Sequence, residues 1–590
     1  MILQALEECY GIMTNDEKFD VAPVGYTKLL CAFVLVINEQ GDLKGIMDLR
    51  DGKRGQPQIV PLQPGRSSGV KPYILCDKSK YLLGKEYNAK TKQLEQFKKH
   101  LEACIEVHKD FIEKTNDRYL HAVLNFLEKV KEGRALNIDE EHDIYKGSNI
   151  VFRIEGEKEC IHQNANVKSL WEAYHKSSEE KADNQLRGQC LITGEENVPL
   201  ASKHTLTKGV MGAQQAGATL AGVNLDSVES YGKKKSYNAP VSEQAMFRYT
   251  TALNSLLASN ANHLIIGDTT CVFWTEKEVV GNCTQILMSL FTGEAIEKAE
   301  KEVQIASQET KQTKDILARV RRGLNITPEM LEMDKGTKVY ILGLAPNMAR
   351  LSVRFWYEDT FGKFVDKISQ HYLDMEIVKG DKDKPIISTR DIIRAMAVQG
   401  KNENVPKTVE NALFTAITSG TNYPQGVYTN ILIRIRAETG EDFCINQTRA
   451  AFIKAYLKRK YRLNKWETKE EEITVALNES STSTAYQLGR LFAVLEKIQA
   501  DAGNKGLRER YFSSASTNPK VVFPAILKLS QSHIAKLSKE QGNVYLDKVC
   551  EDILSHIEAF PASLSLDDQG LFILGYYHQR KYIFTKKENR

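Results

Sequence analysis

The chain has 590 residues, of which 42% are hydrophobic and 26% charged, and its formal net charge is +4. This length exceeds what one hydrophobic core supports, so we expect two to four domains of ordinary globular composition. The ten cysteines form no C-x-x-C pair, which argues against a zinc ribbon or disulfide framework and fits a reducing cytoplasm. Neither a signal-peptide pattern nor a run of about 18 apolar residues is present, so we expect no export and no membrane partner.

The N-terminal third predicts a mixture of strands and helices. Ala32–Ile37 is an apolar run typical of a buried strand, and we expect it to form a hairpin with Leu43–Leu49. Apolar residues at helical spacing predict a helix within 86–133, and a short strand is expected at Asn149–Ile154. Cys190–Glu195 has the pattern of a strand that ends in a turn.

Residues 51–72 predict an irregular basic loop. It contains a G-x-S-x-G string, but flanking prolines occupy the positions where a hydrolase needs a strand and a helix. Small hydroxyls and backbone amides beside basic side chains suit phosphate or base contacts, although an ordinary connector has the same composition. The candidate DNA contacts in this loop are Arg66, Ser67, Ser68 and Lys71.

Residues 208–257 are the most distinctive stretch. The first part has four glycines, two adjacent glutamines and no acid, and three consecutive lysines follow between two tyrosines. Pro240 and Ser242 then begin a helix with one apolar stripe. Flexible backbone allows close approach to a partner and lysines neutralise phosphates, whereas the alternative is a surface loop with a solvated charge run. The candidate DNA contacts are Gln214, Gln215, Lys233, Lys234 and Lys235.

Two more hairpins are predicted in the middle of the chain. Leu264–Ile266 is expected to pair with Thr270–Trp274, and Val339–Leu344 with Arg350–Trp356. Between the hairpins, residues 294–322 have the pattern of a strongly charged helix.

The last of these strands carries a row of polar side chains. Leu351, Val353 and Phe355 are predicted to form its buried face, so the opposite face presents two arginines and a serine. Such a row suits a nucleic-acid backbone, and the alternative is a solvent face with an acidic neighbour. The candidate contacts on this strand are Arg350 and Arg354.

From about residue 386, helical patterns replace strand patterns. Residues 451–466 hold six basic residues, four aromatic residues and no acid, a combination typical of backbone neutralisation with stacking. A linker is expected over 467–483, and four amphipathic helices after it predict a small bundle. The candidate DNA contacts in the basic segment are Lys454, Lys458, Arg459, Lys460, Arg462 and Lys465.

These patterns predict an α+β fold in three parts. Residues 1–385 form a mixed body with β-hairpins and helices, 386–470 a helical basic connector, and 471–590 a C-terminal helical bundle. Walker A, G-x-G-x-x-G and H-E-x-x-H strings are all missing, so the residues favour a non-catalytic nucleic-acid binder without a cofactor or metal. A metal-dependent nuclease is the alternative, and its candidate residues are His204, Asp226 and Asp268.

Several long strings, in the same order along the chain, resemble one protein family. They are Met1–Leu6, Arg66–Pro72, Lys208–Val210 with Gly212–Gln214, Glu229–Gly232, Asn238–Glu243, Leu342–Asn347, Arg350–Trp356 and Gly575–Arg580. The family is the large subunit of the type I-C CRISPR surveillance complex, Cascade. The resemblance covers the chain from end to end.

The resemblance implies a subunit of a crRNA-guided complex in the prokaryotic cytoplasm. Such a subunit reads the protospacer-adjacent motif in double-stranded DNA, aids strand separation and R-loop formation, and recruits the helicase–nuclease, while guide pairing reads the remaining sequence. The implied partners are target DNA, crRNA, and the backbone, handle-binding and small subunits. A structural scaffold that contacts crRNA alone is a further alternative.

The family's C-terminal region resembles the Cascade small subunit, which is also made from an internal start in the same gene. Met396 is the last methionine of the chain and lies well before the predicted bundle. A separate product that covers the bundle alone would therefore need a non-AUG start, for example at the codon for Val475.

Overall fold

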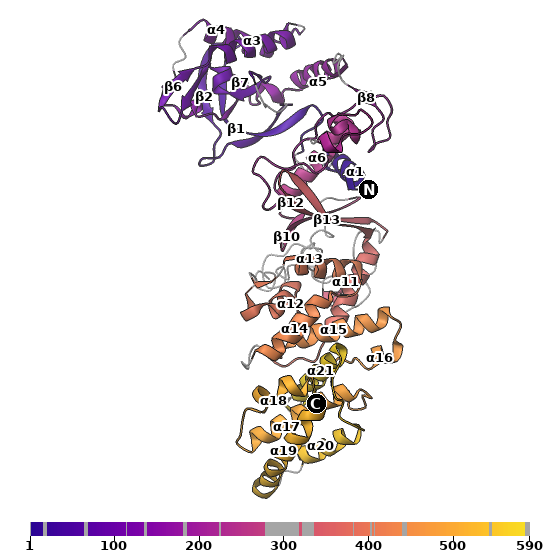
Figure 1. Ribbon diagram of the computed structural model, residues 1–590. Helices are drawn as coiled ribbons and strands as arrows, with labels where there is room; N and C mark the ends of the chain where they lie inside the picture. The colour runs from indigo at the N-terminus through magenta and orange to yellow at the C-terminus, as the bar shows by residue number, and fades with distance from the viewer. Residues whose placement is uncertain are drawn as a thin grey trace. The chain divides into compact units, whose positions relative to one another are not determined.

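The computed structural model describes most of the chain, in two compact units (Figure 1). The first unit comprises Leu3–Leu206 and Ala221–Ser255, and the second comprises Thr207–Leu220 and Leu256–Arg590. Within the described residues, no helix combines the length and apolar character needed to cross a bilayer. The described residues are 2–15, 21–63, 69–113, 115–134, 138–180, 186–223, 226–277, 318–320, 336–381, 383–401, 404–405, 407–438, 445–541 and 545–584.

The first unit is built on a mixed sheet around β1 (Tyr26–Ile37). β2 (Leu43–Asp48) pairs antiparallel with its second half, which confirms the predicted hairpin, and β3 (Gln56–Pro61) pairs antiparallel with its first half. β7 (Asn149–Ile154) lies parallel to β1 and carries the short β4 (Cys76–Lys78) on its other side. The basic loop over 51–72 therefore contains a strand that the sequence analysis missed.

Helices cover this sheet and close its core. α3 (Lys98–Ile112) and α4 (Arg118–Lys131) bury apolar residues together with the inner face of β1 and β7. The single helix predicted within 86–133 is wrong at its start, because β5 (Lys85–Asn88) and β6 (Gln93–Gln96) form a hairpin there. Asp117 also begins a new helix, since its carboxylate accepts the N–H groups of Tyr119 and Leu120.

Further helices and two short strands complete the first unit. α1 (Ile2–Asn15), α2 (Ser79–Leu82), α5 (Ala165–Glu180) and α6 (Glu243–Ala258) are helices, and α6 starts where its cap was predicted. The expected strand at Cys190 is wrong, because Cys190–Glu195 is only a turn. The neighbouring strands of this region are β8 (Arg187–Gly188) and β9 (Val198–Pro199).

The second unit begins with an antiparallel four-stranded sheet. β10 (His263–Ile266), β11 (Thr269–Thr275), β12 (Lys338–Asn347) and β13 (Arg350–Thr360) follow one another in space as in sequence, which confirms both predicted hairpins. The charged helix predicted over 294–322 lies outside the described residues, apart from 318–320.

The remainder of the second unit is helical, which confirms the predicted α+β class (Figure 1). One hydrophobic core runs from the sheet through these helices, so the expected boundaries at 385 and 470 both fall inside it. The predicted linker over 467–483 is ordered, because Glu472 accepts hydrogen bonds from Ser481 and Thr482. The helices are α11 (Phe361–Met375), α12 (Thr389–Met396), α13 (Lys407–Ser419), α14 (Gln425–Ala437), α15 (Gln447–Leu463), α16 (Glu467–Glu471), α17 (Thr484–Asp501), α18 (Leu507–Ala515), α19 (Pro519–Gln541), α20 (Tyr545–Ser555) and α21 (Leu566–Phe584).

Candidate nucleic-acid interface

The glycine-rich segment 207–220 is fastened to the sheet of the second unit. Thr207 and Ala218 close it on itself through reciprocal backbone hydrogen bonds of 2.9 Å, and Thr219 pairs with Arg350 on β13. The backbone N–H of Met211 donates to the Thr270 hydroxyl at 3.0 Å. The segment is therefore held against β11–β13 at several points and does not hang free as a surface loop.

The two adjacent glutamines lie at a turn of this fastened segment. The N–H of Gly217 donates to the carbonyl oxygen of Gln214 at 2.9 Å, and Gly217 has a φ of +104°, a conformation that favours glycine. Gln214 and Gln215 are both exposed. Each presents a carboxamide with donors and an acceptor, which is the chemistry that reads base edges.

The three lysines of the first unit lie on the surface and share one braced loop, residues 229–238. Asn238 donates from Nδ2 to the carbonyl oxygens of Lys233 and Lys235, at 2.7 and 2.9 Å. The side chains of Lys233, Lys234 and Lys235 are exposed. In the part of the chain that the structure describes, none of their ammonium groups has an ion-pair partner.

A fourth lysine joins this group through a backbone contact. The N–H of Ser236 donates to the carbonyl oxygen of Ser202, at 3.4 Å, which places Lys203 beside the lysine loop. Lys203 is also exposed and has no ion-pair partner among the described residues. No local pattern in the sequence indicates Lys203, because it is 30 residues from Lys233 in the chain and only the long-range hydrogen bond shows the proximity.

The basic loop predicted around Ser67 is only partly described. Arg66, Ser67 and Ser68 lie outside the described residues, so their candidate roles stay predictions. Lys71 is described and exposed.

The arginine row on β13 differs from its prediction. A bulge interrupts the pairing of β12 with β13, because Gly343 lies opposite Phe355 while Leu344 lies opposite Val353. Arg354 is the unpaired residue of the bulge, and Val353 is 44% exposed, so the predicted buried face is wrong at this position. Gly343 permits this geometry, because a Cβ there would lie 2.5 Å from the Phe355 ring.

An acidic neighbour faces the exposed arginine of this row. Arg354 Nη2 lies 3.4 Å from Asp268 Oδ2, and Asn411 donates to Asp268 Oδ1 at 2.9 Å. Burial alone would raise the pKa of Asp268, but the Asn411 hydrogen bond and the Arg354 charge together lower it. Arg350 is half-buried. Arg354 thus lies on a strand face with an acidic neighbour, which is the alternative given above for this row.

The basic segment on α15 faces largely inward. Lys454 and Arg459 are 0% and 1% exposed, so the prediction that they contact DNA phosphates is wrong. Arg459 Nε lies 3.0 Å from the buried carboxylate of Asp374, and Arg462 Nη2 lies 2.8 Å from the same group. Lys454 Nζ donates to the Asp374 carbonyl oxygen at 3.0 Å.

Lys458 and Lys460 of α15 are both engaged, whereas Lys465 beyond the helix is exposed. Lys460 Nζ contacts the Asp567 carboxylate at 2.7 Å, and Lys458 is half-buried with a 3.4 Å contact to the carbonyl oxygen of Ile473. Lys465 is exposed, just beyond the end of the helix, and has no ion-pair partner in the described part of the chain. Of the six basic residues predicted here, Lys465 is the one that keeps an open surface position.

Lys454 gives a pH-dependent prediction. Burial lowers the pKa of its ammonium group to about 8, and the charge of nearby Lys458 adds to the effect. Below pH 8 both the folded and unfolded chains bind the proton, so the cost of burying the charge is fully present. As pH rises toward the ordinary lysine pKa of about 10.4, the folded chain releases the proton first and this cost falls.

We therefore expect the wild type to gain about 2 kcal/mol of stability relative to Lys454→Met between pH 7 and pH 9.5. Urea unfolding of the two proteins at both pH values measures this difference. A difference in stability that does not change with pH would contradict the lowered pKa of the buried Lys454 ammonium group.

In the described structure, the candidate residues of the alternative nuclease are each buried, paired or simply exposed. His204 is buried, its Nδ1 lies 2.6 Å from the Tyr249 hydroxyl, and burial lowers its pKa to about 4. Asp268 is engaged by Asn411 and Arg354, and Asp226 is exposed. Among the described residues, no group of three or more His, Cys, Asp or Glu side chains has a metal-binding arrangement.

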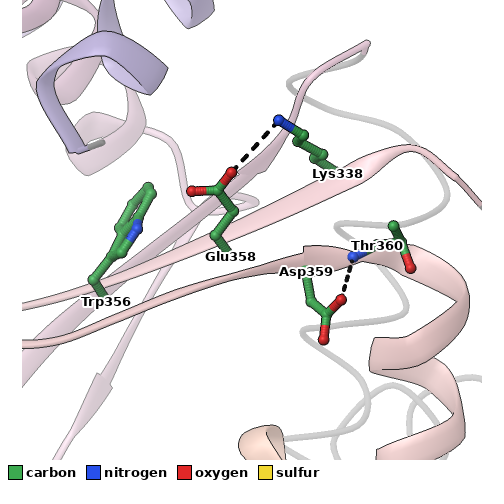
Figure 2. A pocket seen from close by; sticks show the side chains of 5 residues that line it. All are labelled: Lys338, Trp356, Glu358, Asp359 and Thr360. Atoms are coloured by element: carbon green, nitrogen blue, oxygen red, sulfur yellow. Dashed lines mark hydrogen bonds and ion pairs between the residues drawn. The ribbon is translucent and has the colours of Figure 1, made fainter.

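A pocket of about 490 Å³ lies at the end of the β12–β13 hairpin (Figure 2). Lys338 Nζ lies 3.5 Å from Glu358 Oε1, and Asp359 Oδ1 accepts the N–H of Thr360 at 2.9 Å. Its single lysine thus already faces a carboxylate, so the lining does not suit a phosphate. The lining residues are Lys338, Trp356, Glu358, Asp359 and Thr360.

Comparison with protein families identifies the class of the chain. The family model described as CRISPR-associated protein (Cas_Csd1) matches residues 6–584, so the chain belongs to this family. This is the family of the large subunit of the type I-C Cascade, which confirms the resemblance seen in the sequence. None of the curated proteins compared with the chain matches it significantly.

Proposed function

We propose that the chain is the non-catalytic Cascade subunit that recognises the protospacer-adjacent motif in double-stranded DNA. It aids strand separation and R-loop formation in the prokaryotic cytoplasm, and it offers the surface to which the helicase–nuclease is recruited. Its partners are the crRNA and the backbone, handle-binding and small subunits. Membership of the family of Cascade large subunits supports this proposal.

The observation that carries the DNA contact is the group of exposed lysines on the first unit. Lys233, Lys234 and Lys235 lie on the loop braced by Asn238, and Lys203 lies beside that loop. All four lysines are exposed and have no ion-pair partner in the described chain. Phosphate contacts of this kind supply sequence-independent affinity and fix the orientation of a protein on the duplex. We assign these four lysines to the DNA backbone.

The motif itself requires groups that reach base edges. Gln214 and Gln215 suit this role, because their carboxamides are exposed on a segment fastened to the sheet. Ser67, Ser68, Arg66 and Lys71 of the basic loop suit it by residue type. Arg350, Arg354 and Lys465 are further candidates for the nucleic-acid backbone, and the ion pair of Arg354 with Asp268 would have to open first.

Neutralising the lysine loop is expected to flatten the salt dependence of DNA binding. The triple change Lys233→Gln, Lys234→Gln and Lys235→Gln removes up to three phosphate contacts, each worth about 0.9 in the slope of log K against log salt concentration. The slope should therefore fall by about 2 to 3. Titration of the assembled crRNA complex with motif-bearing duplex, between about 50 and 200 mM salt, measures it.

The matched control removes three exposed lysines from the C-terminal helical region, Lys520→Gln, Lys528→Gln and Lys539→Gln. It makes the same change in net charge and should leave the slope nearly unchanged. Equal slopes for wild type and the loop variant would remove Lys233–Lys235 from the interface. Loss of crRNA binding with unchanged duplex binding would favour the crRNA-only scaffold.

A further inference from the structure

Tyr231 is the most exposed large hydrophobic residue of the described chain. Its side chain is 99% accessible, and it lies at the tip of the loop that carries the three lysines. A tyrosine normally buries much of its ring, because aromatic side chains contribute a large apolar area. A ring held wholly in solvent next to exposed cations therefore requires an explanation beyond packing.

The turn that displays this ring is tightly defined. The N–H of Lys233 donates to the carbonyl oxygen of Ser230 at 3.0 Å, and φ is +53° at Tyr231 and +68° at Gly232. Positive φ at both central residues is the signature of a type I′ turn, which favours asparagine or glycine. The tyrosine thus occupies a position that disfavours it both by conformation and by exposure.

Side chains of Asn238 and Glu229 hold the backbone of this turn through hydrogen bonds. Asn238 Oδ1 accepts the N–H of Ser230 at 2.9 Å, while its Nδ2 donates to the carbonyl oxygens of Lys233 and Lys235. Glu229 Oε1 accepts the N–H of Lys235 at 2.9 Å. These bonds fix the backbone that carries the ring, so little ordering is needed when a ligand meets it.

We propose that Tyr231 stacks on an unpaired nucleobase at a junction between duplex and single-stranded DNA. The inference rests on the proposed function, because it assumes that the lysine loop lies against target DNA. The lysines beside the ring hold the phosphates of the strand, and the ring covers the face of the first unpaired base. The ligand class is a DNA fork, rather than intact duplex.

Stacking explains why an aromatic residue is kept at this position. Every base has a flat face, so one ring can serve any sequence, and each stacked base contributes about 1–3 kcal/mol, or about 5- to 150-fold in affinity. An intact duplex offers no free face until two base pairs are unstacked, which opposes binding. The ring therefore favours DNA whose strands have already begun to separate.

The test compares two DNA ligands bound by the assembled crRNA complex. One is a motif-bearing duplex, and the other has the same sequence with mismatches next to the motif that open a fork. We expect Tyr231→Ala to weaken binding to the forked DNA about 5- to 150-fold and to change duplex binding much less. Tyr231→Phe keeps the ring and should bind the fork like wild type.

A third variant controls for folding. Tyr231→Gly removes the ring but suits the positive φ, so its thermal unfolding should match or exceed that of wild type while fork binding falls as for alanine. Equal fork affinity for wild type and Tyr231→Ala overturns the stacking role. The stacking role is also overturned if Tyr231→Phe binds the fork as weakly as Tyr231→Ala. The same holds if Tyr231→Ala acts by preventing assembly of the subunit into the complex.

The lysine triple variant separates this inference from the proposed function. If that variant loses affinity for both DNA ligands while Tyr231→Ala loses none, the loop contacts DNA but the ring does not stack. If the wild-type complex shows no preference for motif-bearing DNA, the proposed function fails, and the stacking role is overturned with it. If fork binding depends on Tyr231 alone, the ring holds the base and the phosphate role of the lysines is wrong.

Discussion

Asp374→Asn is expected to lower the free energy of unfolding of the second unit by about 3–5 kcal/mol. The Asp374 carboxylate is 0% exposed and compensates the guanidinium groups of both Arg459 and Arg462. Gln370 donates a further hydrogen bond to it at 3.1 Å. Removing this charge leaves Arg459 buried without its counter-ion, and an uncompensated buried charge is among the most destabilising single changes.

The rest of the Arg459 environment cannot replace the carboxylate. Its guanidinium lies 3.9 Å from the centre of the Tyr423 ring and donates to the carbonyl oxygen of Ala416 at 3.2 Å. The Tyr423 hydroxyl is itself engaged, 2.6 Å from Nδ1 of His371. These neighbours satisfy donors but carry no negative charge, so the charge balance of this buried site depends on Asp374.

A matched control is the ion pair of Lys460, the residue that follows Arg459 on α15. Asp567→Asn breaks the ion pair with Lys460, in which the Lys460 side chain is 31% exposed and the Asp567 side chain 25%. Because the pair is partly in solvent, its loss should lower the free energy of unfolding by no more than about 1 kcal/mol. Urea unfolding of both variants measures the contrast. Adding Arg459→Met to Asp374→Asn should recover part of the loss. Similar losses for Asp374→Asn and Asp567→Asn would contradict a buried charge cluster.

The same cluster explains why sequence analysis misread the basic segment. A segment of six basic residues that itself contains no acid has the local pattern of a nucleic-acid contact, but the compensating Asp374 is 85 residues before Arg459. Local charge patterns do not contain such distant partners. Burial of Lys454 and Arg459 is likewise a tertiary property, since the chain around them alternates polar and apolar residues as a surface helix does.

Features with a local cause were predicted well. The three hairpins follow from alternating or continuous apolar runs joined by turn residues, and α6 follows from its proline and serine start. The strands β3 and β5 were missed, because their residues are mostly polar or include prolines and gain their structure by pairing with a neighbour. Helix α18 lacks a clear apolar stripe and was missed for a similar reason.

The lysine loop shows both sides of this limit. Lys233–Lys235 were predicted from three adjacent letters, and their side chains are exposed, as both a phosphate contact and a solvated charge run require. Lys203 joins them only through the Ser236–Ser202 backbone contact. The nearly complete exposure of Tyr231 is likewise not predictable from the local sequence. A Tyr-Gly pair before lysines is nevertheless a local signal for a turn, and it could have directed attention to the ring.

Gly489→Ala and Gly575→Ala are each expected to destabilise the helical region by more than about 3 kcal/mol. α17 and α21 cross with their backbones in contact at these glycines. A Cβ on Gly489 would lie 1.9 Å from the carbonyl oxygen of Phe572, and one on Gly575 would lie 2.1 Å from that of Tyr486. Backbone atoms cannot rotate away as a side chain can, so the two helices must separate.

Separation of the helices would open the centre of the core. Phe492 packs against Phe572 and Tyr576 across this crossing, with ring centroids 6.1 Å apart in both pairs. Glycine in a helix interior is about 1 kcal/mol less favourable than alanine, so both glycines persist against local propensity because only they allow this approach. The free energy lost from packing would thus exceed the free energy gained from the higher helix propensity of alanine.

Gly426→Ala on α14 is the matched control, because a Cβ there meets nothing within 4 Å. This change should leave stability unchanged or raise it by up to about 1 kcal/mol. Thermal unfolding of the full chain, with limited proteolysis to locate the opened region, compares the three variants. If alanine at 489 or 575 behaves like alanine at 426, the close crossing of α17 and α21 is wrong. If both crossing variants unfold early while the first unit stays protected, the backbone contact at these glycines holds the helical region together.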